Sequence, residues 1–337
     1  MGDLSNYMVG DYRDLMSYSD MVKKYGLTKM SPLIITVSIT GGQHGAEANP
    51  NLPEEPHAQA QSTLDAYNAG ASLVHIHRRS PENPAIDTKK AEEYLEVNRL
   101  VRAKCPDIII NNTCIGGHTV DTQNMTMSDL LHVSCAARPE VASIDITTTT
   151  QRMNLGARSA EIGGERPAFV KKFDLMNTDE DIVELLKYFD KYDIKPEWEM
   201  YNLTDIKRLK GIIDKGIIKG PHWCMMLFGG NGVFPNYQAM ALATQMLPEN
   251  AIFSTINIGG AHNAMLAQSI IMGNHIRVGL EDVTYYGPHQ LAESNAQLVE
   301  RAVRIAKELG RPIATPAQAR EMLGLGAPRQ YDFEIEE

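Results

Sequence analysis

From Leu33 onward, short runs of β-branched and other apolar residues alternate with longer segments in which apolar residues recur at helical spacing. This alternation is typical of βα units around a parallel sheet. Strands are expected at 33–39, 72–77, 108–112, 141–146, 195–201, 222–228, 251–256 and 274–280. Helices are expected between and after them, at 56–69, 88–103, 128–136, 179–189, 204–215, 237–246, 261–272 and 289–309, with a last short helix after 315. Eight βα units predict an α/β fold of the (β/α)8 TIM-barrel class.

The βα units form one unbroken series, so we expect a single barrel domain over residues 32–326. Residues 1–31 are polar and rich in Tyr, Asp and Met, and they are expected to form an N-terminal extension. This extension is either an arm that packs on a neighbouring subunit or an irregular segment. Residues 327–337 are expected to form an acidic C-terminal tail.

At 337 residues with 43% hydrophobic side chains, the chain can bury a core large enough for one barrel. Its net charge of −10 argues against a nucleic-acid partner, because phosphate recognition relies on clustered Lys and Arg. The four cysteines form no C-x-x-C pair, which argues against a Cys-based zinc motif and indicates a reducing, cytoplasmic setting. No window approaches the ~20 apolar residues of a membrane-spanning helix and no signal peptide is recognised, so we expect a soluble protein without a membrane partner.

One predicted strand ends on two histidines. Strand alternation places His75, His77 and Arg79 on one face and Val74, Ile76 and Arg78 on the other. With the apolar face against the helices, the imidazoles point into the barrel about 7 Å apart, where both can reach one metal ion. The alternative is a hydrogen-bonded pair of core histidines. Because an unsatisfied imidazole at the end of an apolar strand is costly, the pattern favours a metal site.

The eighth predicted strand carries residues that suit the same site. Alternation places Arg277, Gly279 and Glu281 on one face, and Asp282 begins the following loop. A catalytic zinc usually takes three protein ligands, and barrel closure brings this strand near the histidines, so Glu281 is the expected third ligand. Arg277 beside it suits an anion. The alternative is a structural ion pair between Arg277 and Glu281.

The fifth predicted strand is acidic. Glu197, Glu199 and Tyr201 share its inward face. Buried carboxylates need cations or donors, so we expect them to pair with Arg79 or Arg277 and to support the site.

Hydroxyl groups and glycines follow other strands. Thr113 and Thr148 supply hydroxyls suited to a carboxylate or thioester oxygen. Glycines at strand ends either let backbone amides approach a ligand or make tight turns. They are Gly41, Gly42, Gly116, Gly117, Gly229, Gly230, Gly232, Gly259 and Gly260.

Five segments are distinctive in combination. They are 32–42, 49–53, the His75-x-His77-x-Arg79 strand, 277–282 and 292–299. Together they resemble the β-keto acid cleavage enzymes, whose best-known activity is 3-keto-5-aminohexanoate cleavage, over residues 31–326. The resemblance implies a zinc-dependent (β/α)8 barrel, usually a homo-oligomer such as a dimer or tetramer. It also implies an acyltransferase that converts a β-keto acid and acetyl-CoA into acetoacetate and a new acyl-CoA.

The resemblance implies roles for individual residues. His75, His77 and Glu281 match the zinc ligands, Arg277 matches a catalytic cation that binds a carboxylate, and Asp282 matches the general base. Cobalt or manganese would fit the same ligands. The residues expected to bind substrate are Gln43, Arg79, Thr113, Thr148 and Glu199. The residues expected, from loop position, to bind acetyl-CoA are Gly229, Gly230, Gly259 and Gly260.

One position departs from the family pattern. Gln43 follows Gly42, where an acidic residue can occur in members that handle an amino-bearing substrate. A neutral amide cannot balance an ammonium group, so we expect a keto acid with a neutral or acidic side group rather than 3-keto-5-aminohexanoate. The stretch 114–117 is one residue longer than the family's usual glycine-rich turn, which affects the alignment near Thr113.

The expected reaction joins Claisen and retro-Claisen steps, with the metal acidifying the carbon between the keto and carboxylate groups. Two other functions stay open. A metal-dependent hydrolase of the amidohydrolase type also uses an H-x-H strand but needs further ligands, for which His222 and His262 are candidates. A catalytically silent barrel would act as a binding protein without metal. The combination of His, Arg, Glu and Asp at matching strand ends argues against it.

Overall fold

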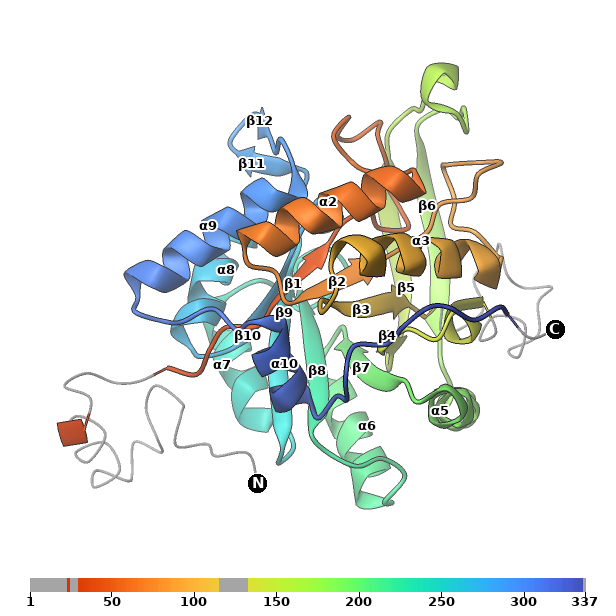
Figure 1. The fold of residues 1–337 in the computed structure, drawn as a ribbon. Coiled ribbons are helices and arrows are strands. Elements are labelled where there is room, and N and C mark those ends of the chain that lie inside the picture. Colours follow the sequence, from red (N-terminus) through yellow and green to blue (C-terminus); the bar gives the residue numbers. More distant parts are fainter. Residues whose placement is uncertain (1–22, 25–29, 115–132, 336–337) are drawn as a thin grey trace.

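The centre of the protein is a closed barrel of parallel strands (Figure 1). The computed structural model describes residues 23–24, 30–114 and 133–335. Around the barrel the strands follow the order β1-β10-β9-β8-β7-β4-β3-β2. They are β1 (Ile35–Ser38), β2 (Leu73–Ile76), β3 (Ile109–Thr113), β4 (Val141–Asp145), β7 (Lys195–Met200), β8 (His222–Phe228), β9 (Ala251–Asn257) and β10 (His275–Val278). Each overlaps one of the eight predicted strands, so the predicted (β/α)8 barrel is confirmed.

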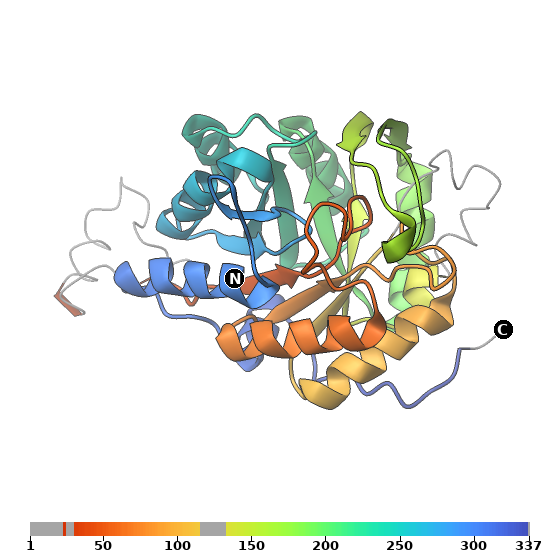
Figure 2. The same ribbon diagram turned by 90° about the horizontal axis from the view of Figure 1, so that it is seen from above.

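Helices surround the barrel on its outside, as Figures 1 and 2 show from two directions. They are α2 (Pro56–Ala69), α3 (Ala91–Lys104), α5 (Asp179–Tyr192), α6 (Leu203–Asp214), α7 (Tyr237–Met246), α8 (His262–Ile271), α9 (Asn295–Glu308) and α10 (Pro316–Leu323), with the 3-10 turn η4 (Gly259–Ala261) before α8. Of the helix predicted at 128–136, only residues 133–136 are described, and they are helical.

The helix predicted from residue 289 begins later, at Asn295. The Ser294 hydroxyl accepts a hydrogen bond from the Gln297 amide and caps the helix there. The residues before it form a small antiparallel pair, β11 (Tyr285–Gly287) and β12 (Gln290–Leu291).

Apolar side chains fill the amino-terminal end of the barrel interior. Leu73, Ile109 and Val141, each the first residue of its strand, form one buried cluster with Trp223 and with the α10 residue Leu323. Short helix α10 lies below this end of the barrel (Figure 1). The amino-terminal end is therefore closed, and polar inward side chains are concentrated at the carboxyl ends of the strands.

A long antiparallel hairpin, absent from the predicted elements, interrupts the βα series after β4. It consists of β5 (Thr148–Leu155) and β6 (Phe169–Met176), with the 3-10 turn η3 (Ala160–Ile162) near its tip. It projects from the barrel, and its tip lies beside the loop that follows β1 (Figures 1 and 2). There the fully buried Arg158 side chain pairs with Glu47 at 2.7 Å and Glu54 at 2.7 Å.

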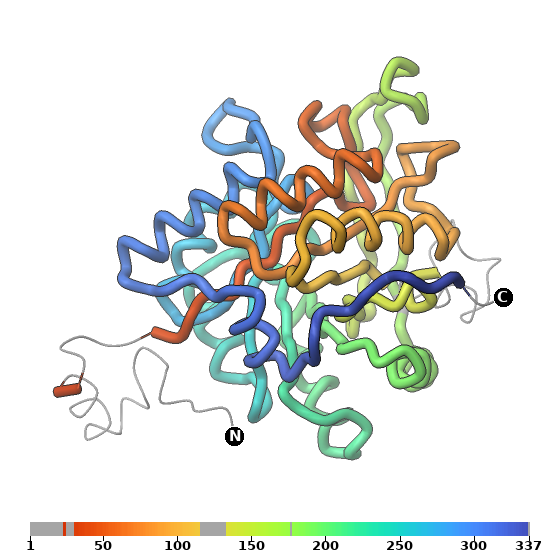
Figure 3. The backbone as a smooth tube through the Cα atoms, in the orientation of Figure 1, coloured from red at the N-terminus to blue at the C-terminus, as the bar shows by residue number. Residues whose placement is uncertain are grey.

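The C-terminal segment packs along the barrel instead of leaving it. Figure 3 traces it in blue from α10 along the outside of the fold. Tyr331 is buried, and α3 holds the segment through hydrogen bonds from Arg99 to the Tyr331 carbonyl and from Arg102 to the Arg329 carbonyl. Most of the predicted extension 1–31 lies outside the described residues. Among the described helices, none has the length and apolar character needed to cross a membrane.

Candidate active site

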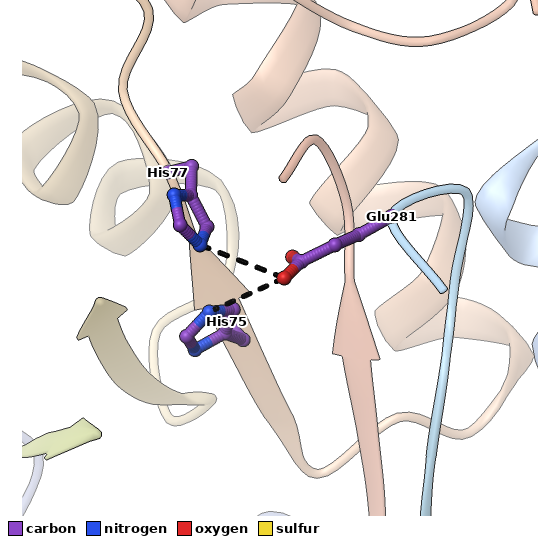
Figure 4. Close-up of side chains that lie close together, drawn as sticks. All are labelled: His75, His77 and Glu281. Carbon is purple, nitrogen blue, oxygen red and sulfur yellow. Dashed lines mark ion pairs between the residues drawn. The ribbon is translucent and has the colours of Figure 1, made fainter. Parts of the chain in front are cut away.

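Three side chains converge at the carboxyl ends of β2 and β10 (Figure 4). His75 lies in β2, His77 directly follows it, and Glu281 follows β10. The Glu281 Oε1 atom lies 3.8 Å from His75 Nε2 and 3.5 Å from His77 Nε2. One possible ligand atom from each of the three residues lies within 4.8 Å of the other two. This is the predicted trio, and its spacing suits one divalent ion.

The chemistry of these groups also fits a metal ion. Burial holds the pKa of His75 well below its ordinary value, so the imidazole is neutral and its nitrogen can donate a lone pair. Burial opposes the ionisation of Glu281, but Arg277 and the two histidines outweigh it and hold its pKa well below the ordinary range. The buried Glu281 Oε2 atom has no hydrogen-bond partner among the described residues. A cation would satisfy this oxygen.

Two glycines after β1 make room for the trio. A Cβ atom at Gly41 would lie 2.6 Å from Glu281 Cγ, and one at Gly42 would lie 2.8 Å from His77 Nδ1. Across the barrel seam, a Cβ atom at Gly279 would overlap the carbonyl oxygen of Ser38. Because they lack a Cβ atom, the three glycines let β1 and the loop after it lie close to the segments that carry His77 and Glu281.

Asp87 orients His77, a contact that the sequence pattern does not predict. Its Oδ2 atom lies 2.7 Å from His77 Nδ1. Burial alone would lower the pKa of His77, but Asp87 and Glu281 raise it to about 10. A carboxylate on the far nitrogen fixes the ring and increases its basicity, as is usual for metal-binding histidines. Asp87 lies on a loop ten positions after His77, where strand alternation predicts nothing.

Arg277 links the trio to Asp282. Its guanidinium donates to Asp282 at 3.0 and 3.1 Å, to Glu199 at 3.1 Å, and also to Glu281. The Ser38 hydroxyl donates to Asp282 at 2.7 Å. Burial raises the pKa of Asp282, although Arg277 opposes the shift. A partly desolvated carboxylate beside the metal ligands can accept a proton.

A second carboxyl pair lies beside Arg277. Asp145 and Glu199 occupy paired positions on β4 and β7, and both line the same cavity. Burial raises the pKa of Asp145 to about 6 and that of Glu199 well above its ordinary value. Burial therefore disfavours the charged form of both carboxyl groups, while Arg277 opposes this effect.

The trio opens into a cavity of about 710 Å³. Its floor consists of the residues just described, and one wall is the β5–β6 hairpin, which contributes Gln151, Met153, Phe173 and Leu175. Gln151 is buried, and its Nε2 atom has no hydrogen-bond partner among the described residues. This wall was not predicted, because the Thr-rich segment was expected only to supply hydroxyl groups.

Three of the five residues predicted to bind substrate line the cavity, and two do not. Gln43, Thr113 and Glu199 line the cavity. Arg79 is buried outside the cavity lining and donates to the His44 carbonyl at 2.6 Å. Its Nε atom lies 3.8 Å from Asp87 Oδ1, so Arg79 neighbours the carboxylate that orients His77. A direct role of Arg79 in substrate binding stays a prediction.

Thr148 and most of the predicted cofactor glycines also lie outside the cavity lining. Thr148 is the exposed first residue of β5. Gly230 lines the cavity, whereas Gly229, Gly259 and Gly260 do not. The Gly259 amide donates to the Asp282 carbonyl at 3.2 Å, which positions the loop that carries Asp282.

Neither His222 nor His262, the two candidate further ligands for a hydrolase of the amidohydrolase type, lies at the trio. His222 begins β8, at the opposite end of the barrel. The His262 Nδ1 atom lies 2.6 Å from the Asn257 carbonyl oxygen. Among the described residues, His75, His77 and Glu281 form the one group arranged for a metal.

The fold and the site thus define a (β/α)8 barrel with a His-His-Glu candidate metal centre beside an Arg-Asp pair. The sequence profile of the beta-keto acid cleavage enzymes matches residues 32–325. The chain belongs to this family, as the resemblance predicted.

The sequence match to individual relatives extends over nearly their whole length. The chain is 32% identical to a 3-keto-5-aminohexanoate cleavage enzyme of Acetoanaerobium sticklandii, over 88% of this chain and 99% of that protein. It is 30% identical to a 3-oxoadipate:acetyl-CoA acetyltransferase of Cupriavidus necator, over 87% and 95% of the two chains. The structure of ObcA has the same fold, with a TM-score of 0.61 at 18% identity over 82% of this chain and 66% of ObcA.

Proposed function

We propose that this protein is a metal-dependent β-keto acid cleavage enzyme, an acyltransferase that converts a β-keto acid and acetyl-CoA into acetoacetate and a new acyl-CoA. The observation that carries the proposal is the His75, His77 and Glu281 trio, placed against Arg277 and Asp282 at the base of the cavity. Relatives over most of the chain are named for reactions of β-keto acids with acetyl-CoA.

His75, His77 and Glu281 would hold the ion, with zinc expected. A bound divalent ion would polarise the keto oxygen of the substrate and acidify the neighbouring carbon. Asp282 accepts the proton from that carbon, and the Ser38 hydroxyl and Arg277 hold its carboxylate in place. Arg277 binds the substrate carboxylate and balances the negative charge that develops.

The rest of the reaction forms one carbon–carbon bond and breaks another. The deprotonated carbon attacks the acetyl carbonyl of acetyl-CoA, and the CoA thiolate leaves. The thiolate then attacks the original keto carbonyl, and the bond from that carbonyl to the central carbon breaks. The new acyl-CoA departs, and Asp282 returns its proton to the central carbon of acetoacetate.

We propose further that the β-keto acid carries a neutral or acidic side group. Gln43 lines the cavity, and its buried Oε1 atom has no hydrogen-bond partner among the described residues. An uncharged amide here suits a neutral or acidic side group better than an ammonium group.

We also propose that the protein assembles as a homo-oligomer. Helix α7 has no charged residue, and Tyr237 and Leu242 on it are 57% and 46% exposed. Nearby Phe234 is 77% exposed. Exposed apolar groups of this kind are typical of subunit interfaces. Light scattering of the purified protein should give a dimer or tetramer mass, and a monomer mass would contradict this part.

The activity is tested by mixing the purified protein with acetyl-CoA and three keto acids, one neutral, one acidic and one amino-bearing, and measuring acetoacetate. We expect turnover of the neutral or acidic acid and none with His75→Ala, which should also lose bound metal. If no keto acid reacts although one equivalent of metal is bound, the proposed reaction is wrong.

A further inference from the structure

The two faces of the β5–β6 hairpin differ in character. Side chains alternate along both strands, so Gln151, Met153 and Phe173 face the cavity. Arg152 and Lys172 alternate with these residues and are exposed, and Arg152 also borders the cavity. Lys171 lies on the inward face and lines the cavity, with its Nζ atom 5.4 Å from the centre of the Phe173 ring. The hairpin thus joins an apolar cavity wall to a cationic outer edge.

The outer face contains an unfavourable pair. Arg152 and Lys172 are directly opposite each other in the strand pairing. Like charges at directly opposed positions destabilise a hairpin. Neither side chain forms an ion pair with a carboxylate within the described ranges of the chain. The carboxylate on this face, Asp174, accepts a hydrogen bond from Thr150 at 2.7 Å. A chain of net charge −10 therefore keeps a local group of cations beside the cavity.

The glycine loops on the other side of the cavity are occupied by internal contacts. The Gly229 amide donates to the Val233 carbonyl, and a Cβ atom at Gly229 would lie 2.5 Å from the Ile258 carbonyl oxygen. The Gly259 amide donates to Asp282. Close packing of the chain explains Gly229, and neither of these two amides is available to bind phosphate.

We propose that Arg152, Lys171 and Lys172 on the β5–β6 hairpin bind the phosphate groups of acetyl-CoA, with the pantetheine arm passing over Met153 and Phe173 toward the metal trio. This inference rests on the proposed function. The diphosphate and the 3′-phosphate supply the negative charge that the Arg152–Lys172 pair lacks, and a guanidinium binds phosphate oxygens in a bidentate manner. The apolar wall suits the uncharged arm between the phosphates and the thioester.

The test compares two thioesters that differ in the phosphates. Acetyl-CoA carries them, and S-acetylpantetheine has the same reacting end without them. In the double variant Arg152→Gln/Lys172→Gln, and in Lys171→Gln, we expect KM for acetyl-CoA to rise ~10-fold with kcat unchanged. KM for S-acetylpantetheine should stay at the wild-type value. The matched control is Lys187→Gln/Lys307→Gln, which removes the same charge from exposed positions on α5 and α9.

Two results would overturn the inference. One is an unchanged KM for acetyl-CoA in the hairpin variants, and the other is an equal rise for both thioesters, which would indicate a damaged wall. The melting temperature of the double variant should equal or exceed that of the wild type, because the repulsion is removed.

If the wild type turns over no keto acid, the proposed function fails and calorimetric titration with CoA still tests the hairpin. Binding that weakens ~10-fold in the double variant supports the inference, and equal binding contradicts it.

Discussion

The Arg158 network fixes the far end of the hairpin, and its removal should loosen the cavity wall. Arg158 donates to Glu54 at 2.7 and 2.9 Å, to Glu47 at 2.7 Å, and to the Ile162 and Gly163 carbonyls. Arg158→Met keeps an unbranched apolar stem and removes every one of these side-chain donors. Glu47 retains Arg166 at 2.7 Å, whereas Glu54 retains the Ala46 amide at 3.0 Å as its described partner.

The loss of stability depends on which buried groups lose their partners. Removing one member of a buried ion pair costs roughly 3 to 5 kcal/mol, because an uncompensated charge stays buried. Glu54 is 11% exposed and Glu47 keeps a second arginine, so the lower end of that range applies. A local loss of about 3 kcal/mol corresponds to an opening equilibrium on the order of 100-fold more favourable.

Hydrogen exchange measures this opening directly. Amides of β5 and β6 should exchange on the order of 100-fold faster in Arg158→Met, while amides of β8 and β9 keep their protection. Arg304→Met, an exposed substitution of the same kind on α9, serves as the control. Unchanged protection of β5 and β6 would contradict this prediction, since the hairpin would then be held by its strand pairing and wall contacts alone.

Other substitutions test single groups of the site. Asp282→Asn should retain one equivalent of metal and lose ~10²- to 10⁴-fold in kcat, and loss of the metal instead would assign Asp282 to the ligands. Asp87→Asn should weaken metal affinity ~10- to 100-fold in a chelator competition, and unchanged affinity would remove Asp87 from the metal site. Burial opposes the ionisation of Glu47, but hydrogen bonds from backbone amides and Arg158 lower its pKa below 4.5. Glu47 therefore stabilises the folded state above pH 4.5, and this contribution is lost as the pH falls through its folded pKa. The difference in melting temperature between wild type and Arg158→Met should shrink over the same interval, and a constant difference would contradict this assignment.

Strand periodicity was sufficient to predict the barrel and the metal trio. Inside a regular strand alternate side chains share a face, so His75 could be placed inward from the sequence. Glu281 was placed by barrel closure, which brings the end of β10 beside β1 and near β2. Beyond the end of β2 the same alternation still placed His77 at the trio, whereas Arg79 lies outside the cavity lining.

Contacts made by loops and by the hairpin could not be predicted in the same way. Asp87 reaches His77 through a turn, and Gln151 reaches the cavity through a pairing of β5 with β6 that the polar, Thr-rich sequence did not indicate. Both depend on long-range arrangement of the backbone, which the spacing of apolar residues does not encode.

The closure of the barrel has a consequence for synthesis on the ribosome. Strand β1 pairs with β2 on one side and with β10 on the other. At ~5 to 20 residues per second, on the order of 10 to 50 s separate the synthesis of Ser38 from that of His275. Throughout that interval the apolar strand β1 has one unpaired edge, which can pair with another nascent chain. We therefore expect newly made chains to depend on chaperones until β10 emerges, and chains truncated before β10 to aggregate.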